Sequence, residues 1–231
     1  MTFEILTRQP LKFYEKNGVK FFEDFYAVDK FKRPVKVFMG SQNNCSTIFT
    51  ENVDKQRAFY EIDINPQGRE MLGSSMEANP KRQGIGEILN LAALIEFHKN
   101  KLNYFRLFSL KDAIPMYARY GFKMITDSVD EILHNLHMVQ RSSDRYLHLK
   151  RNAFYYYPQV AGSVASDDPY MLRRASDVVS NYMKEMSRNG ERVDASQLKY
   201  DAKMVFTDWE FQTDRNYLNE MLDKHEINYK V

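Results

Sequence analysis

A short basic, glycine-containing stretch, Asn79–Glu87, has the residue types of an anion-binding turn. Its two glycines, Gly84 and Gly86, stand directly before a long apolar pattern with helical spacing. Glycine has no Cβ, so the chain can turn tightly there and come close to a ligand. A helix that starts at such a turn has backbone N–H groups without partners and a positive partial charge at its first residues. With Lys81 and Arg82 alongside, the stretch predicts a binding site for a phosphate or pyrophosphate.

Two familiar phosphate-binding motifs are excluded by the residues around this turn. A Rossmann fingerprint needs a third glycine where this chain has Leu89. A P-loop needs Gly-Lys-Ser/Thr, which does not follow. A Gly-x-Gly pair alone also occurs in ordinary turns before helices. A second motif, Ala113–Phe122, therefore matters, because it follows the turn after one further strand-like segment.

Taken together, Lys81–Gly86 and Ala113–Phe122 resemble the signature of the GNAT superfamily of acyl-CoA-dependent N-acyltransferases. That signature is Arg/Gln-x-x-Gly-x-Gly/Ala at the start of a helix, then Ala-x-x-aliphatic-Tyr-x-x-x-Gly-Phe. The resemblance covers roughly the first two-thirds of the chain. It implies an α+β fold with a mixed, mostly antiparallel sheet flanked by helices. It also implies transfer of an acetyl (acyl) group to an amine of a small molecule or protein, with acetyl-CoA as co-substrate and no metal.

The resemblance implies a set of coenzyme-binding residues around the turn. Backbone N–H groups would hold the pyrophosphate with two basic side chains alongside, and the pantetheine arm would follow the preceding strand. These residues are Gln83, Gly84, Ile85, Gly86 and Glu87, then Lys81 and Arg82, and for the pantetheine arm Met76 to Ala78. Lys81 stands where the family has Arg or Gln, and a lysine supplies a point charge but no planar bidentate contact.

Tyr117 and Glu70 are the catalytic residues that the resemblance implies. Tyr117 matches the tyrosine that lies near the coenzyme sulfur and protonates the departing thiolate. Its alternative role is that of an interior aromatic on a short helix. Glu70, at the start of the strand before the turn, would be the general base. Its alternative is a solvated turn residue, and Glu61 and Asp63 are other candidates for the base. The family often has an Asn where this chain has Leu110–Asp112. Because of this departure, the resemblance does not assign the contacts on the adenine side or the sulfur side of the coenzyme.

Composition bounds the class of protein. The chain has 231 residues, 33 basic and 31 acidic, so its net charge of +2 gives no electrostatic case for nucleic acid. Its one cysteine, Cys45, excludes an internal disulfide framework and suits a reducing compartment. The most apolar stretch falls short of the ~20 residues that span a bilayer. We therefore expect a cytoplasmic protein without a membrane partner.

The first part of the chain must position the glycine turn. It has strand-like runs up to about residue 64 and a possible short helix at Lys12–Lys16. Glu70–Ala78 is predicted to be a strand and Ile85–Lys99 a helix. That helix is apolar over most of its circumference, whereas packing on a sheet needs one face only. We therefore expect a further segment to cover its outer side. A strand at Asn103–Leu110 and a helix at Ala113–Tyr120 follow.

The remainder of the chain is predicted to contain a helix capped by Asp127 or Ser128 and a closing strand at Arg145–Arg151. Beyond the linker that follows, the sequence pattern becomes helical. We predict a GNAT-like domain over residues 1–158 and a helical C-terminal extension over residues 159–231, joined by a small-residue linker at 161–166. Helices are expected from Asp168, from about Asp194 through Val205, and around Tyr217. The extension either folds back onto the Ile85–Lys99 helix, or forms a homodimer or grips a protein partner.

Three further interpretations stay open at this point. Asp130, His134 and His137 have helical spacing that could hold a metal, although a solvent-exposed polar face explains them better. Phe154–Tyr157 could stack nucleic-acid bases, although packing explains this run better. The alternative function is a catalytically inactive GNAT-fold binding or regulatory protein whose C-terminal helices engage a partner. Lys81 and the missing Asn favour that alternative, whereas the glycines and Tyr117 oppose it.

Overall fold

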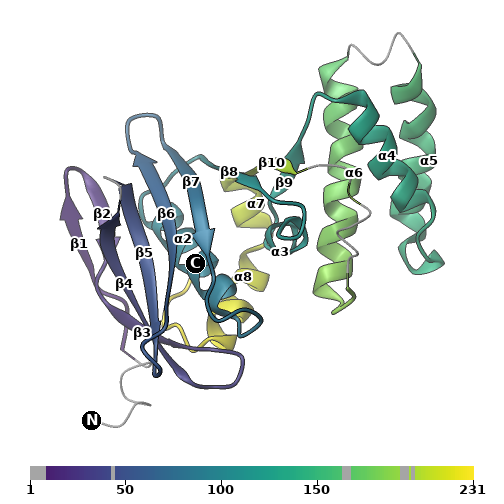
Figure 1. Cartoon of the computed structure of the whole chain (residues 1–231). Helices are drawn as coiled ribbons and strands as arrows, with labels where there is room; N and C mark the ends of the chain where they lie inside the picture. The colour runs from purple at the N-terminus through teal and green to yellow at the C-terminus, as the bar shows by residue number, and fades with distance from the viewer. Residues whose placement is uncertain (1–8, 43–44, 163–167, 193–197, 199–200) are drawn as a thin grey trace. The chain divides into compact units, whose positions relative to one another are not determined.

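The computed structural model describes residues 9–42, 45–162, 168–192, 198 and 201–231 (Figure 1). The chain forms two compact units. The first consists of Met1–Arg106 together with Phe211–Val231, and the second is Leu107–Glu210. The C-terminal segment thus belongs to the same unit as the glycine turn.

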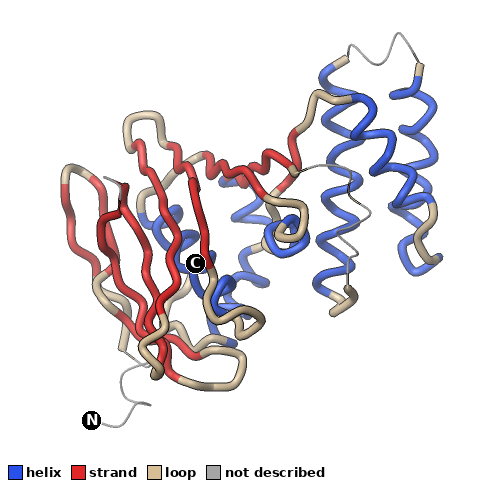
Figure 2. The backbone as a smooth tube through the Cα atoms, in the orientation of Figure 1, coloured by secondary structure: helices blue, strands red, loops and turns tan. Residues whose placement is uncertain are grey.

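Antiparallel strands form the first unit's sheet, in the order β3-β4-β5-β6-β7 with β8 next to β7 (Figure 2). A separate two-stranded hairpin, β1-β2, precedes them. The strands are β1 Phe13–Lys16, β2 Val19–Phe22, β3 Phe25–Val28, β4 Pro34–Gln42, β5 Cys45–Asn52, β6 Arg57–Asn65, β7 Glu70–Glu77 and β8 Tyr104–Ser109, which crosses the unit boundary after Arg106. The mostly antiparallel α+β arrangement that the sequence predicts is confirmed for this unit.

Alternation along these strands separates a core face from an outer face. Val35, Val37, Ile48 and Ile62 are fully buried, and so is Phe105 of β8. Successive strand side chains point to opposite faces, so these residues line a single side of the sheet. The Tyr60 ring on this face contacts Phe105 of β8, at 6.2 Å between ring centroids. Phe105 in turn stacks on Phe97 of helix α2, so this is the face that α2 covers.

Helix α2 (Ile85–Lys99) is buried on nearly all sides and has the predicted bounds. It packs on β5, β6 and β7 on one side and meets α8 (Arg215–Lys224) on another. Phe211 places its ring 4.8 Å from the ring of His98, and the His98 Nδ1 lies 2.8 Å from the Tyr229 hydroxyl. Residues 211–231 therefore cover the outer side of α2, and the fold-back hypothesis is confirmed for them.

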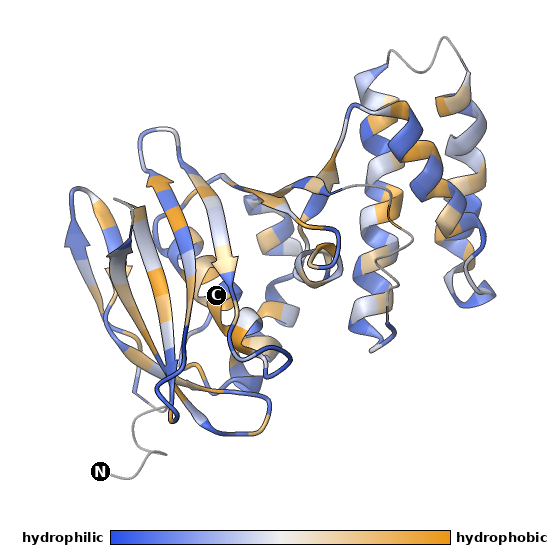
Figure 3. Ribbon diagram, viewed as in Figure 1, coloured by the Kyte–Doolittle hydropathy of each residue, from blue (hydrophilic) through white to orange (hydrophobic). Residues whose placement is uncertain are grey.

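The second unit contains helices around a short antiparallel pair of strands. Helices α4, α5 and α6 contact one another, and α3 and β9 pack on α6. Figure 3 shows hydrophobic and hydrophilic residues alternating along α6. The elements are α3 Ile114–Arg119, β9 Lys123–Ile125, α4 Val129–Gln140, the 3-10 turn η1 Asp144–Tyr146, α5 Leu147–Ala161, α6 Pro169–Arg188, β10 Ala202–Thr207 and α7 Asp208–Thr213, which crosses the unit boundary.

Local signals place several of these elements as predicted. The Ser128 hydroxyl caps α4 by accepting a hydrogen bond from the Glu131 N–H at 3.3 Å. Asp168 caps α6 in the same way, through the Tyr170 N–H at 2.9 Å.

β9 lies at the edge of the strand order, and α6 covers that edge. The Ser180 hydroxyl accepts a hydrogen bond from the Met124 N–H at 3.0 Å, and the Ser176 hydroxyl donates to the Met124 carbonyl at 2.9 Å.

Three element predictions are wrong. Phe13–Lys16 is the strand β1 and not a short helix. Arg145–Arg151, expected as a closing strand, lies in η1 and α5, and the Phe154–Tyr157 run lies in α5. The alternation at 145–151 spans too few residues to exclude the helical spacing that continues to Val160. The helix expected from Asp194 begins outside the described residues, and its later part is strand β10, where apolar Ala202, Met204 and Phe206 alternate.

The predicted division at residue 158 falls inside α5. The two compact units divide the chain between Arg106 and Leu107 and again between Glu210 and Phe211. The division into a domain at 1–158 and an extension at 159–231 stays a prediction. The linker predicted at 161–166 lies mostly outside the described residues. The part of the extension from residue 168 onward supplies the predicted helix α6, the strand β10 and the terminal helix α8.

A buried glutamate fastens the β1-β2 hairpin to α2. Glu96 is fully buried, and its Oε1 accepts a hydrogen bond from the Phe22 N–H at 2.7 Å. Asn100, one turn later, accepts from the Lys20 N–H and donates to the Lys20 carbonyl, both at 2.8 Å. Burial raises the pKa of Glu96 from the ordinary 4.5 to about 8, and the hydrogen bonds from Phe22 and Asn100 partly offset it.

Glu96 is expected to make stability fall with rising pH. It holds its proton in the folded protein up to about pH 8 but loses it near 4.5 in the unfolded chain. The free energy of unfolding should therefore decline between these values and then level off, by about 1.4 kcal/mol for each unit of pKa difference. Urea denaturation across this range should show a much flatter profile for Glu96→Gln, which cannot ionise. An equally steep decline in that variant would contradict the assignment.

Candidate functional site

The glycine turn presents three backbone donors at the start of α2. Gly84 is the residue before the helix, with φ 86°, and the Ile88 N–H donates to its carbonyl at 3.1 Å. Among the described residues, none accepts a hydrogen bond from the N–H groups of Gly84, Ile85 or Gly86. Ile85 is buried, whereas both glycines are half-buried. These donors, at the positive end of a 15-residue helix, suit an anion.

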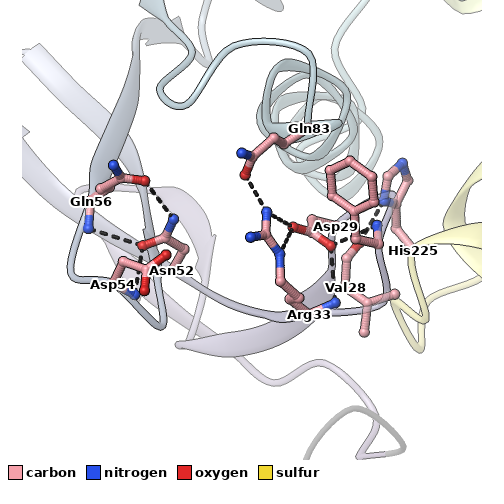
Figure 4. A network of polar contacts seen from close by, with 9 residues as sticks. Val28, Asp29, Arg33, Asn52, Asp54, Gln56, Gln83 and His225 are labelled. Atoms are coloured by element: carbon pink, nitrogen blue, oxygen red, sulfur yellow. Dashed lines mark hydrogen bonds and ion pairs between the residues drawn. The ribbon is translucent and has the colours of Figure 1, made fainter.

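The β3–β4 turn supports one side of the glycine turn (Figure 4). Asp29 has a side chain only 2% exposed, and it ion-pairs with Arg33 at 2.7 Å. Its Oδ1 also accepts hydrogen bonds from the Phe31 and Arg33 N–H groups, at 2.8 and 2.9 Å. Arg33 then donates to the Gln83 side-chain oxygen, and the Lys30 N–H donates to the Gln83 carbonyl at 3.0 Å. Gln83 is therefore fixed by its side chain as well as its backbone.

The C-terminal segment supports the other side through His225, which is fully buried. Its Nδ1 lies 2.7 Å from the Val28 carbonyl oxygen, and the Val28 N–H donates to the His225 carbonyl at 2.9 Å. Its Nε2 lies 3.1 Å from Oε2 of Glu87. A Cβ at Gly84 would lie 3.3 Å from Cε1 of His225 and 3.4 Å from the Lys30 nitrogen. Position 84 therefore needs glycine for its positive φ and for this close approach.

The other predicted coenzyme-binding residues lie along this turn and the strand before it. Lys81 and Arg82 are exposed, and Arg82 has a φ of 62°. Met76 is half-buried and pairs with Tyr60 in the β6–β7 register, and Ala78 directly follows β7. Glu87 is held by Lys224 at 2.9 Å as well as by His225. The structure thus brings all nine predicted residues together around one strand end and helix start.

Glu70 lies at the opposite end of β7 from this turn. The strand separates Glu70 from Glu77 by roughly 23 Å at the usual rise per residue. Its carboxylate is 40% exposed and pairs with Arg106 at 3.2 Å. On β6, Glu61 is buried and Asp63 is exposed, and both point away from the face that α2 covers. The role of Glu70 as a base stays a prediction, as do those of Glu61 and Asp63.

Tyr117 belongs to the second unit, where it lies in α3, two residues before the last residue of that helix. It is only 5% exposed, and its ring meets the Phe122 ring edge-on at 5.4 Å. The Phe122 N–H donates to the Tyr117 carbonyl at 3.2 Å across Gly121, whose φ is 97°. The Tyr-x-x-x-Gly-Phe spacing therefore also forms a helix end that buries both aromatic rings. The catalytic role of Tyr117 stays a prediction.

Sequence reasoning missed three residues that fix the turn: Asp29, Arg33 and His225. Asp29 and Arg33 are spaced four apart before a proline, a pattern that could have predicted a turn but not its contact with Gln83. Nothing in the sequence around His225 marks it, because its partners lie far away along the chain.

The described parts of the chain contain no group of three or more His, Cys, Asp or Glu side chains placed to hold a metal ion. Of the helical histidines, His137 places its Nδ1 3.3 Å from the Gln140 side-chain oxygen. No helix within the described residues has both the length and the apolar character that crossing a membrane requires.

Comparisons with known proteins give little similarity. No family model matches the sequence, and no similar curated protein was found. Among solved structures, the crystal structure of nourseothricin acetyltransferase aligns with 51% of this chain and 70% of its own, at 15% identity and a TM-score of 0.33. At that TM-score the likeness carries no argument about activity.

A matched pair of glycine substitutions tests the packing around the turn. Gly84→Ala and Gly18→Ala both place a side chain at positive φ, but nothing lies within 4 Å of a Cβ at Gly18. The shared conformational cost is about 1–2 kcal/mol. Urea denaturation should show a larger loss for Gly84→Ala, because its methyl group also meets His225 and Lys30. Equal losses would show that the contact with His225 is not close.

Proposed function

We propose that the protein is an N-acyltransferase that moves an acetyl (acyl) group from coenzyme A to an amine of a small molecule or protein. One observation supports this most: the N–H groups of Gly84, Ile85 and Gly86 point from a half-buried helix start and have no acceptor among the described residues. A diphosphate offers several charged acceptor oxygens and suits such a set of donors. Lys81 and Arg82 add exposed positive charge beside it.

The residues around the turn fit coenzyme A in chemistry and order. The pyrophosphate would accept hydrogen bonds from the turn, and Lys81 would act as a point charge. The pantetheine arm would run beside the end of β7, where Met76 and Ala78 lie. The supports from Arg33 and His225 hold the turn in place before a ligand arrives, which reduces the ordering cost of binding.

The proposed reaction needs a neutral amine and a proton for the leaving group. The amine nitrogen attacks the thioester carbonyl carbon, and the carbon–sulfur bond breaks. A base takes the proton from the amine nitrogen, and the Tyr117 hydroxyl gives its proton to the departing sulfur. Glu70, Glu61 and Asp63 are the candidate bases. Tyr117 belongs to the second unit, so its role is a separate part of the proposal.

A specific observation favours the alternative, a binding or regulatory protein without catalysis. Gln83 and Glu87 are engaged by Arg33 and His225, and Tyr117 is buried against Phe122. Three residues of the two motifs thus have a role in the fold. Coenzyme binding without transfer would support this alternative.

Coenzyme A is expected to bind the wild-type protein, and Lys81→Ala/Arg82→Ala is expected to weaken its affinity about tenfold or more, since two charge-assisted contacts are removed. Isothermal titration calorimetry measures this directly. Lys16→Ala/Lys20→Ala is the control, because it removes two exposed charges from the hairpin instead. The absence of binding heat with the wild-type protein would overturn the proposal.

Tyr117→Phe is expected to lower transfer about 10²–10⁴-fold without changing coenzyme affinity, because it removes a general acid. Release of free thiol from acetyl-CoA, measured with a panel of small amines and peptides, reports transfer. Tyr120→Phe, also a buried tyrosine in the same segment, should retain activity. Full activity in Tyr117→Phe would remove this residue from the mechanism, and binding with no thiol release from any amine would favour the alternative.

A further inference from the structure

Glu87 occupies a position that conflicts with anion binding at the turn. Gly84 precedes the first residue of α2, which makes Glu87 the third helical residue. A glutamate at this position commonly reaches back to the backbone N–H of the residue before the helix. Here that N–H belongs to Gly84, one of the three donors. A carboxylate that reached it would occupy the donor and repel an anionic ligand.

The structure holds the Glu87 carboxylate elsewhere. Its Oε2 lies 2.9 Å from Nζ of Lys224 and 3.1 Å from Nε2 of His225, and the side chain is 18% exposed. The Lys224 ammonium and the His225 imidazole, at the end of α8, therefore hold this carboxylate towards the C-terminal segment, and the Gly84 N–H has no acceptor among the described residues.

Both ring nitrogens of His225 lie beside groups that accept hydrogen bonds. The Val28 carbonyl oxygen beside Nδ1 only accepts hydrogen bonds, as does the Glu87 carboxylate beside Nε2. The Glu87 carboxylate is thus in contact with both the Lys224 ammonium and the His225 imidazole.

Backbone contacts fix the end of α8 at this place. Val28 and His225 exchange a backbone hydrogen bond as well as the imidazole contact. Lys32 donates to the Lys224 carbonyl at 3.0 Å and to the Glu226 carboxylate at 3.3 Å. Lys224 and His225 are thus held by the strand β3 and the turn after it, and not by Glu87 alone.

We propose that Lys224 and His225 are positioning residues for the coenzyme site: they keep the Glu87 carboxylate from capping its own helix and so leave the Gly84 N–H for the ligand. This inference rests on the proposed function. It makes the last residues of α8 part of the site, although neither side chain has to touch the coenzyme.

The test is whether a second substitution, at Glu87, reverses the effect of a substitution at His225 on coenzyme A affinity. His225→Gln removes the imidazole and with it the Nε2 contact to Glu87, and it should weaken coenzyme A binding about tenfold in calorimetry. Glu87→Leu/His225→Gln should restore the affinity to within about threefold of wild type, because the competing carboxylate is gone and leucine offers the Gly84 N–H no acceptor. Lys230→Met is the control: it removes a cation from the same segment that pairs with Asp223 at 2.6 Å and not with Glu87.

Failure of rescue in the double variant would overturn the inference, since His225 would then act through packing alone. Thermal unfolding of each variant shows whether the fold is kept. Amide hydrogen exchange at Gly84 gives a readout that needs no coenzyme: it should slow in His225→Gln, where Glu87 can reach the N–H, and return to the wild-type rate in the double variant. An unchanged exchange rate at Gly84 in His225→Gln would overturn the inference even if coenzyme A binds. A slowed rate in a protein that does not bind coenzyme A would contradict only the proposed function.

Discussion

The left-handed conformation of Gly84 is the constraint on which the first unit depends. It lets the chain leave β7, turn, and enter α2 with no side chain between the turn and the imidazole of His225. Three segments far apart in sequence meet there: the β3–β4 turn, the helix start and the end of α8. The same geometry leaves backbone donors at the turn without acceptors among the described residues. An anion site requires backbone donors without partners, held in place by contacts with neighbouring segments, and this turn has both.

The hydrophobic character of α2 has a related consequence. A helix that is apolar nearly all round must be covered on both sides, and the chain returns after the second unit to do this. The returning segment brings Phe211 and Tyr229 against His98, and then His225 against the turn. Coverage of the helix and support of the turn are therefore achieved by the same residues, 211–231.

The sequence predicted what depends on local pattern. The bounds of α2, the strand at Glu70–Glu77 and the cap at Ser128 follow from glycine, from periodicity and from side-chain capping, all of which act over a few residues. It failed at Arg145–Arg151, where a short alternation could not be told from a helix, and at Ala202–Thr207, where pairing with β9 decides for a strand. The Arg33–Gln83 and His225–Glu87 contacts were beyond reach, because 50 and 138 positions separate the partners.

The central claim is that the amides at the start of α2 bind the coenzyme diphosphate. The protein has nine glycines, so labelling only glycine with ¹⁵N gives a spectrum of few signals in which Gly84 and Gly86 can be assigned by substitution. Titration with coenzyme A should shift these two amide signals and leave that of Gly18, in the β1–β2 turn, unchanged. If coenzyme A moves neither of them, or moves signals elsewhere instead, the turn is not the binding site and the account is wrong.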